Sequence, residues 1–269
     1  MSPIQKIIKY FALALAFLII YSIIFGIYNS VIEINKSINN NQDETTPITK
    51  VIELSNNIKT IDINLTSTNL TIKKGTTFKI KSSTKNIKVE EKANKLIIKE
   101  TSKNLFAKKS SNIEIELSDD YAFNTTNIDI GAGKLTIEHL LTHDLNLDLG
   151  AGYTKIFNLQ ASNKAKISTG AGALIIKNSR LNNLDLDTGV GKTEITSYIK
   201  GKSKIDIGVG DTIINLLGSN NDYTLKIDTS IGTVKVNNKE IKNDTIYGEG
   251  PNYIDIDGGI GKLKVNLDS

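Results

Sequence analysis

Apolar and polar residues alternate over short stretches through much of the second half of the chain. Ile128 and Ile130 precede a Gly-Ala-Gly sequence at residues 131–133, and Leu135 and Ile137 follow it. A period of two places such residues on one face of a β-strand, with the polar residues between them on the other face. The pattern predicts two short strands joined by a glycine turn.

This unit recurs along the chain. Five close copies begin at Ile128, Leu147, Leu186, Ile205 and Ile256, and two looser copies begin at Ile167 and Ile227. Successive first glycines, from Gly131 to Gly208, are 19, 20, 19 and 19 residues apart, and the later steps stretch to 22 and 29. A fixed period of about 20 residues is typical of stacked units that complete one another's core. The repeat therefore predicts an all-β fold, a single-stranded β-solenoid with about 20 residues per rung.

Glycine recurs where each rung must turn the same corner, because it accepts unusual backbone angles and close backbone approach. The predicted corner glycines are Gly131, Gly133, Gly150, Gly152, Gly170, Gly172, Gly189, Gly191, Gly208, Gly210, Gly232, Gly259 and Gly261. The residue between each pair is small or β-branched, and we expect its side chain to point inward and fill the corner.

The first half of the chain carries a weaker form of the same pattern. Residues 63–72 align with residues 128–137, with Thr-Ser-Thr in place of the glycine corner, and further strands are predicted near 78–81, 87–90, 96–99 and 113–117. We interpret residues 50–127 as irregular rungs that cap a regular solenoid at 128–269, with a separate small β-domain as the alternative. Residues 237–253 are predicted to form a loop or hairpin, and residues 262–267 an exposed sheet edge.

An apolar stretch precedes all of this. Residues 10–32 carry no charge and are long enough to span a bilayer as a helix, and Lys6 and Lys9 lie on their N-terminal side. The positive-inside rule then predicts a single-pass anchor with residues 1–9 in the cytoplasm and the solenoid outside the cell membrane. Residues 33–49 are interpreted as a polar linker. A cleaved signal peptide is the alternative, although the apolar run is long for one.

Composition narrows the range of functions. The formal net charge is only +4 and aromatic residues make up 6% of the chain, which disfavours nucleic acid as a partner. The chain has no cysteine, so it has neither disulfides nor thiolate metal ligands. We expect no cofactor.

One set of acidic residues occupies an equivalent position in the repeats. Asp129, Asp148, Asp187, Asp206, Asp228 and Asp257 are expected to form an outward column, offset by nearby lysines at positions 134, 192, 235 and 262. A solvated column is the simpler reading, and a row of weak Ca²⁺ sites is the alternative because carboxylates suit that ion.

Two sequences resemble binding motifs, and one enzyme class is compatible with a β-solenoid, but the residues do not meet the requirements of any of the three. Gly191-Lys192-Thr193 resembles the end of a phosphate-binding loop but lacks the first glycine and the helix that follows. His139 and His143 have a spacing that binds zinc on a helix, yet they fall in a predicted turn. A polysaccharide-cleaving enzyme would need paired carboxylates in a cleft, and the chain has no tryptophan to stack on sugars and a single arginine, Arg180.

The membrane anchor, the linker and the Asp-Ile-Gly-Ala-Gly-Lys-Leu-Thr-Ile type of repeat resemble a bacterial putative-adhesin family, a domain of unknown function with β-strand repeats. The resemblance covers residues 58–267 and implies a right-handed β-solenoid on the cell envelope, with no defined functional residues. The leading hypothesis is a non-catalytic surface module that contacts cell-wall polymer or envelope proteins. An envelope-stress sensor that binds a peptide or a membrane protein is the second hypothesis, and a polysaccharide-acting enzyme is the third.

Overall fold

The computed structural model describes residues 48, 50–55, 57–101, 111–242 and 244–267. These residues contain no helix that is both long and apolar enough to cross a membrane. The expected anchor at residues 10–32, the cytoplasmic segment before it and nearly all of the polar linker lie outside the described residues.

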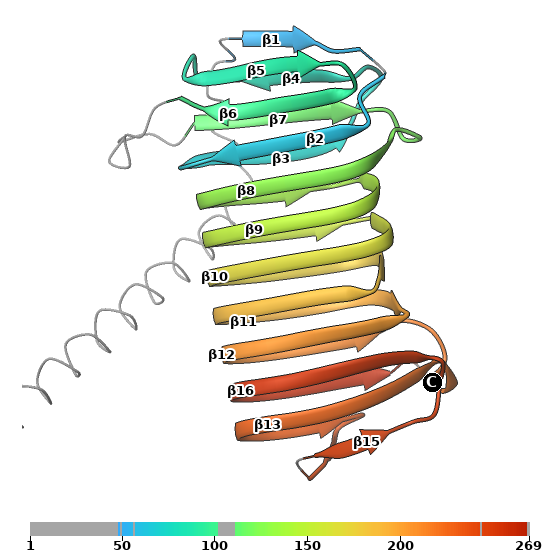
Figure 1. Ribbon diagram of the computed structural model, residues 1–269. Helices are drawn as coiled ribbons and strands as arrows, with labels where there is room; N and C mark the ends of the chain where they lie inside the picture. Colours follow the sequence, from blue (N-terminus) through green and yellow to red (C-terminus); the bar gives the residue numbers. More distant parts are fainter. Residues whose placement is uncertain (1–47, 49, 56, 102–110, 243, 268–269) are drawn as a thin grey trace, which may run out of the picture. The chain divides into compact units, whose positions relative to one another are not determined.

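The glycine-marked half is a stack of parallel coils, each made by one long strand that bends at its Gly-x-Gly (Figure 1). The first five are β8 (Ala122–Ile137), β9 (Leu140–Phe157), β10 (Leu159–Asn182), β11 (Leu184–Lys200) and β12 (Lys202–Leu216). Residues one repeat apart are opposite each other, as in the pair Leu147 and Ile167. The predicted period and stacking are confirmed, although the two predicted strands of a rung are one continuous strand.

The apolar residues of each coil face inward and stack on those of the next coil. Leu186, Ile205, Ile256 and Ile227 form one such column, and each is at most 1% exposed. No coil has a core of its own, so the interior exists only because neighbouring coils complete it.

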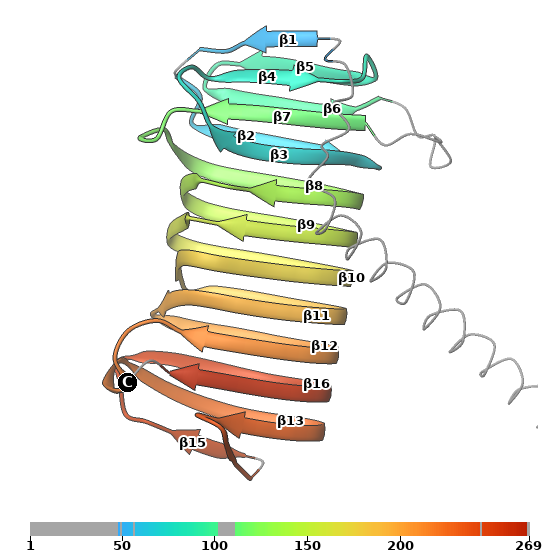
Figure 2. The ribbon, with the colours of Figure 1, turned by 180° about the vertical axis from the view of Figure 1, so that it is seen from behind.

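The N-terminal half continues the same sheet. The corresponding strands are β1 (Lys50–Glu53), β2 (Thr60–Leu65), β3 (Thr68–Lys74), β4 (Lys79–Ser82), β5 (Ile87–Lys92), β6 (Lys95–Glu100) and β7 (Ser111–Leu117). β2 and β3 together form one coil on β8, and β6 and β7 form the next coil outward. The antiparallel strands β5, β4 and β1 close this end (Figure 2).

The corner between β2 and β3 has no glycine, and a side chain stabilises it instead. The Glu100 carboxylate accepts hydrogen bonds from the backbone N–H groups of Thr66 (2.8 Å) and Ser67 (3.0 Å). These amides lie at the bend, and hydrogen bonds to an ionised acceptor are among the stronger ones. The predicted alignment of residues 63–72 with 128–137 is confirmed, since Ile63 pairs with Ile128 and Ile72 with Ile137.

At the C-terminal end, the order of the coils in space differs from their order in the chain. After β12, the chain passes a short 3₁₀ helix at Asn220–Asp222 and forms β13 (Tyr223–Val236), β14 (Lys239–Glu240), β15 (Thr245–Tyr247) and β16 (Asn252–Leu267). β16 lies between β12 and β13 and pairs with both (Figures 1 and 2). The prediction that residues 262–267 form an exposed edge is therefore wrong. β13 is the outermost coil, and β14 and β15 pair with parts of its outer edge.

One column of charges on the outer face agrees with this order. In spatial order, one column of paired residues reads Lys166, Asp185, Lys204, Asp255, Lys226. The sign alternates at every step only because β16 is inserted, and the Lys226 ammonium lies 3.4 Å from the Asp255 carboxylate. Chain order would place Lys204 beside Lys226, and like charges on neighbouring strands repel.

A compact ion-pair cluster lies on the outer face of β3, β4 and β7. The Glu116 carboxylate is 2.8 Å from the Lys79 ammonium and also contacts those of Lys73 and Lys81, while its side chain is only 9% exposed. Burial of this carboxyl acts to raise its pKa, but hydrogen bonds from Lys79 and Lys81 outweigh burial and lower the pKa to about 2.

This shift predicts an acid-sensitive contribution to stability. Because the pKa of Glu116 is lower in the folded chain than the ordinary 4.5, its contribution is complete above about pH 4.5 and disappears as the pH falls toward 2. A shift of this size corresponds to roughly 3 kcal/mol. Denaturant unfolding at pH 7 and pH 3 should show a smaller loss of stability for Glu116→Gln than for the native chain. The exposed Glu240→Gln is the control, and an identical pH dependence in all three proteins would contradict the assignment.

Candidate functional site

The corner of the stack consists of two columns of glycines packed against backbone. At Gly172, φ is +137°, and a Cβ would lie 1.8 Å from the carbonyl oxygen of Gly152 in the preceding coil. At Gly150, in the other column, a Cβ would lie 2.2 Å from the carbonyl oxygen of Gly131. No side chain fits at these distances, so both columns require glycine for close approach, and the column of Gly172 also requires it for its positive φ. The structure places all the predicted corner glycines at this bend.

The residue between the two glycines does not fill the corner from inside, and the prediction that it points inward is wrong. Val209 is 46% exposed, Ile260 is 49% exposed and Ile231 is 65% exposed. The alternation breaks at the bend, so the parity counted along the first arm no longer gives the direction of this side chain.

In spatial order, the residues between the glycines increase in size along the stack. Their order is Ala132, Ala151, Ala171, Val190, Val209, Ile260 and Ile231. The result is an apolar strip along the outside of the corner, small at the β8 end and bulky at the β13 end.

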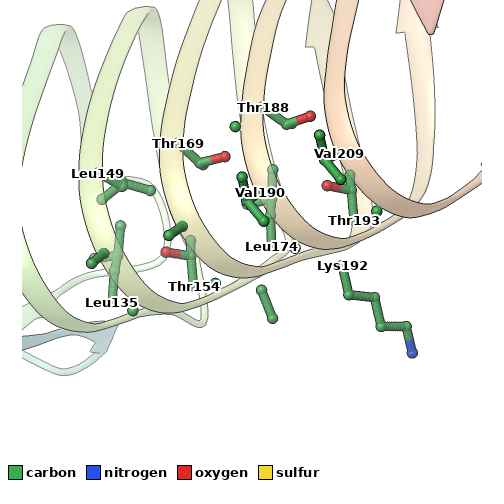
Figure 3. A pocket seen from close by; sticks show the side chains of 18 of the residues that line it. Leu135, Leu149, Thr154, Thr169, Leu174, Thr188, Val190, Lys192, Thr193 and Val209 are labelled. Carbon is green, nitrogen blue, oxygen red and sulfur yellow. The ribbon is translucent and has the colours of Figure 1, made fainter. Parts of the chain in front are cut away.

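A narrow, partly open pocket of about 30 Å³ lies at this corner, and Val190 and Val209 are among the residues that line it (Figure 3). Its lining mixes aliphatic side chains such as Leu135 and Leu149 with threonines, among them Thr154, Thr169 and Thr188. A second cavity, near Gly258 and Leu263, is about 10 Å³. A cavity of the larger size holds about two water molecules, whereas ligand sites are on the order of 300–1,000 Å³. These cavities are too small for an acyl chain or a sugar.

The aspartate column lies on the outer face of the arm before the corner. The register pairs Asp129 with Asp148, and it sets Asp206 beside Asp187 and Asp257, with Asp228 beside Asp257 at the end. Ser168 interrupts the column between Asp148 and Asp187. Burial, and then the neighbouring charge of Asp148, raise the pKa of Asp129.

Lysine partners of this column differ from the expected ones. The Lys204 ammonium is 2.7 Å from one carboxylate oxygen of Asp206, whereas the other oxygen is buried without a hydrogen-bond partner. Among the ion pairs of the described residues, lysines 134, 192, 235 and 262 are not paired with the aspartate column. Within the same residues, no group of three or more histidine, aspartate or glutamate side chains is placed to hold a metal ion.

The remaining motifs occupy ordinary structural positions. β11 runs through Gly191-Lys192-Thr193 as strand, with no helix after it. The ring Nε2 of His139 is 2.8 Å from the carbonyl oxygen of Asp119, and His143 lies beside the Asp144 carboxylate, so the two histidines do not converge. The Arg180 guanidinium lies 5.5 Å from the centre of the Tyr198 ring, a cation–π contact rather than part of an acidic cleft.

Residues 58–249 match the family model described as Toastrack DUF4097, which covers most of the chain. The chain belongs to this family, and the resemblance to a putative-adhesin family of unknown function is confirmed. No curated protein matches the chain.

Three solved structures are matched over most of this chain. A putative cell adhesion protein from Clostridium sporogenes is 16% identical, with 81% of this chain and 98% of that chain covered and a TM-score of 0.35. A putative lipid binding protein from Parabacteroides distasonis is 13% identical, with 82% of this chain and 96% of that chain covered and a TM-score of 0.39. A putative adhesin from Bacteroides fragilis is 15% identical, with 81% of this chain and 98% of that chain covered and a TM-score of 0.30. At these TM-scores, none of the three carries an argument about what this chain binds.

Proposed function

We propose that the chain is a non-catalytic interaction module that binds its partners on the outside of a rigid stack of coils. The observation that carries this proposal is the packed interior of the described residues, where apolar side chains such as Ile205 and Ile256 are fully buried and the two corner pockets are only about 30 and 10 Å³. A partner must therefore contact the outer faces or the corner strip. Repetition of equivalent positions at about 4.8 Å suits extended, repetitive contact along the stack.

The same geometry disfavours a polysaccharide-cleaving enzyme. Glycosidases place two carboxylates about 5–10 Å apart across a cleft that holds the sugar. The aspartates of this chain instead follow one another along a single outer column, in neighbouring strands of one sheet. Carboxylates in such a column cannot flank a scissile bond from two sides.

The proposal includes the cellular setting that the sequence predicts. Residues 10–32 would anchor the protein as a single span with its N-terminus in the cytoplasm, and the solenoid would stand outside the cell membrane. Its partners would then be cell-wall polymer or envelope proteins. Protease added to intact cells should degrade the solenoid but leave residues 1–9 protected, and protection of the solenoid would contradict this setting.

The experiment that tests the function compares binding with turnover. Full-length protein in non-ionic detergent is incubated with cell-wall polymer and with membrane-protein fractions, and both the bound protein and the release of sugar reducing ends are measured. The proposal predicts saturable binding to at least one fraction without release of reducing ends. Sugar release above that of a heat-unfolded control, or no binding to any fraction, would contradict it.

A further inference from the structure

The bulky end of the corner strip is an exposed apolar surface of four stacked residues, which we name the corner ridge. It consists of Val190, Val209, Ile260 and Ile231, in adjacent coils. Exposure rises toward the outermost coil, from the partly exposed Val190 to Ile231 at 65%. Aligned exposed aliphatic side chains of this kind mark interaction surfaces more often than isolated ones do.

Beside the ridge runs a row of like charges, which we name the acidic row. Asp187, Asp206, Asp257 and Asp228 each lie three residues before a ridge residue on the same strand. At about 3.3 Å per residue, the row is about 10 Å from the ridge along the chain. Asp187, Asp228 and Asp257 are exposed, and the Asp206 side chain is 37% exposed.

The acidic row differs from the column of charges next to it. Two residues earlier on the same strands, Asp185, Lys204, Asp255 and Lys226 alternate in sign. Lys226 pairs with Asp255 in that column, whereas Lys204 pairs with Asp206 of the acidic row. In the acidic row, four carboxylates lie side by side. Among the described residues, Lys204 is the one lysine that forms an ion pair with the row, and it does so with Asp206. The row therefore retains negative charge that a partner of opposite charge would neutralise.

The spacing indicates the conformation of such a partner. Neighbouring coils are about 4.8 Å apart, so the four coils span about 14 Å. An α-helix laid along the stack repeats its apolar face about every 5.4 Å, an accumulated mismatch of only about 2 Å over three steps. An extended strand repeats about every 6.7 Å and falls out of step by about 6 Å. A helix is also about 10 Å wide, so basic side chains on its edge reach the acidic row.

We propose that the corner ridge and the acidic row together bind an amphipathic α-helix with a basic edge, about three turns long, from a partner polypeptide. This inference rests on the proposed function and names the class of partner. Apolar side chains of the helix would cover Val209, Ile260 and Ile231, and its lysines or arginines would face the acidic row. An anionic membrane surface fits poorly, because the acidic row would repel it.

The test uses full-length protein in non-ionic detergent and a fluorescent 14-residue peptide of leucine and lysine arranged with helical period. A second peptide has the same composition in strict alternation, and a third has glutamate in place of lysine. Fluorescence anisotropy should show binding of the first peptide, weakened by rising salt because the contact is partly ionic. The other two peptides should bind at least about tenfold more weakly.

Matched variants locate the site. The triple variant Val209→Thr, Ile260→Thr, Ile231→Thr should weaken binding of the helical peptide by about tenfold or more. Asp187→Asn with Asp257→Asn should weaken it by about threefold or more, whereas Asp185→Asn with Asp255→Asn, on the same strands, should leave it nearly unchanged. Circular dichroism melting curves show whether each variant is folded.

The inference is overturned if the alternating peptide binds equally well, if the ridge variant binds normally, or if the two aspartate pairs behave alike. It is also overturned if light scattering shows a dimer that the ridge variant abolishes, because a second copy then covers the ridge. If no peptide binds but the chain still binds an envelope fraction, this inference alone fails. If neither binds, the proposed function fails as well.

Discussion

Replacing Gly172 by alanine is expected to lower the free energy of unfolding by more than about 3 kcal/mol. The new Cβ would lie 1.8 Å from the Gly152 carbonyl oxygen, at a backbone φ of +137°. The neighbouring coil cannot move away, because its own corner packs in the same way against the coil before it. Chemical denaturation followed by far-ultraviolet circular dichroism measures the loss.

Gly131→Ala is the matched control for this substitution. Gly131 has a φ outside the left-handed region, and a Cβ there would lie 3.0 Å from the Thr66 carbonyl oxygen. A shift of a few tenths of an ångström relieves that contact, so we expect a loss of no more than about 1 kcal/mol. Similar losses for both variants would show that the corner does not depend on close stacking of glycine backbones.

The second large effect is expected at Ile256. This side chain is fully buried in β16 between Ile205 and Ile227, so Ile256→Ala should cost about 2–5 kcal/mol through lost burial and the cavity left behind. Ile260, four residues later on the same strand, is 49% exposed. Ile260→Ala should change stability by no more than about 0.5 kcal/mol.

Comparing Ile256→Ala with Ile260→Ala distinguishes the observed corner, in which Ile260 is exposed, from the corner that simple alternation predicts, in which Ile260 is buried. If both isoleucines filled the interior, the two alanine variants would lose comparable stability in urea titrations. Equal losses would place the residue between the glycines in the core after all and would remove the exposed ridge from the account.

The repeat made most of the fold predictable. The period of about 20 residues reports how much chain one coil uses. The apolar pattern of a coil also survives in residues 63–72, where Thr66-Ser67-Thr68 replaces the glycine corner. The alignment of the aspartates also follows from the period, because equivalent residues of stacked coils must lie side by side.

Two features could not be predicted in the same way. Alternation fixes a side chain's direction only while the strand stays regularly extended, and that condition ends at the glycine corner, where Val209 is exposed. Chain order also says nothing about insertion of β16 between β12 and β13. The sequence does contain a signal for this insertion, because charge alternates along Lys204, Asp255 and Lys226 only when β16 lies between β12 and β13. That signal can be used only after the coils are assumed to stack in register.

Cysteine cross-linking tests the stacking order most directly, because the chain has no cysteine of its own. Asp206 pairs with Asp257 in the neighbouring coil, and Asp228 is one coil further away. Disulfides need Cα atoms about 4.4–6.8 Å apart, and coils stack at about 4.8 Å. Under mild oxidation, Asp206→Cys with Asp257→Cys should cross-link and Asp206→Cys with Asp228→Cys should not. Efficient cross-linking of the 206–228 pair and none of the 206–257 pair would contradict the inserted coil.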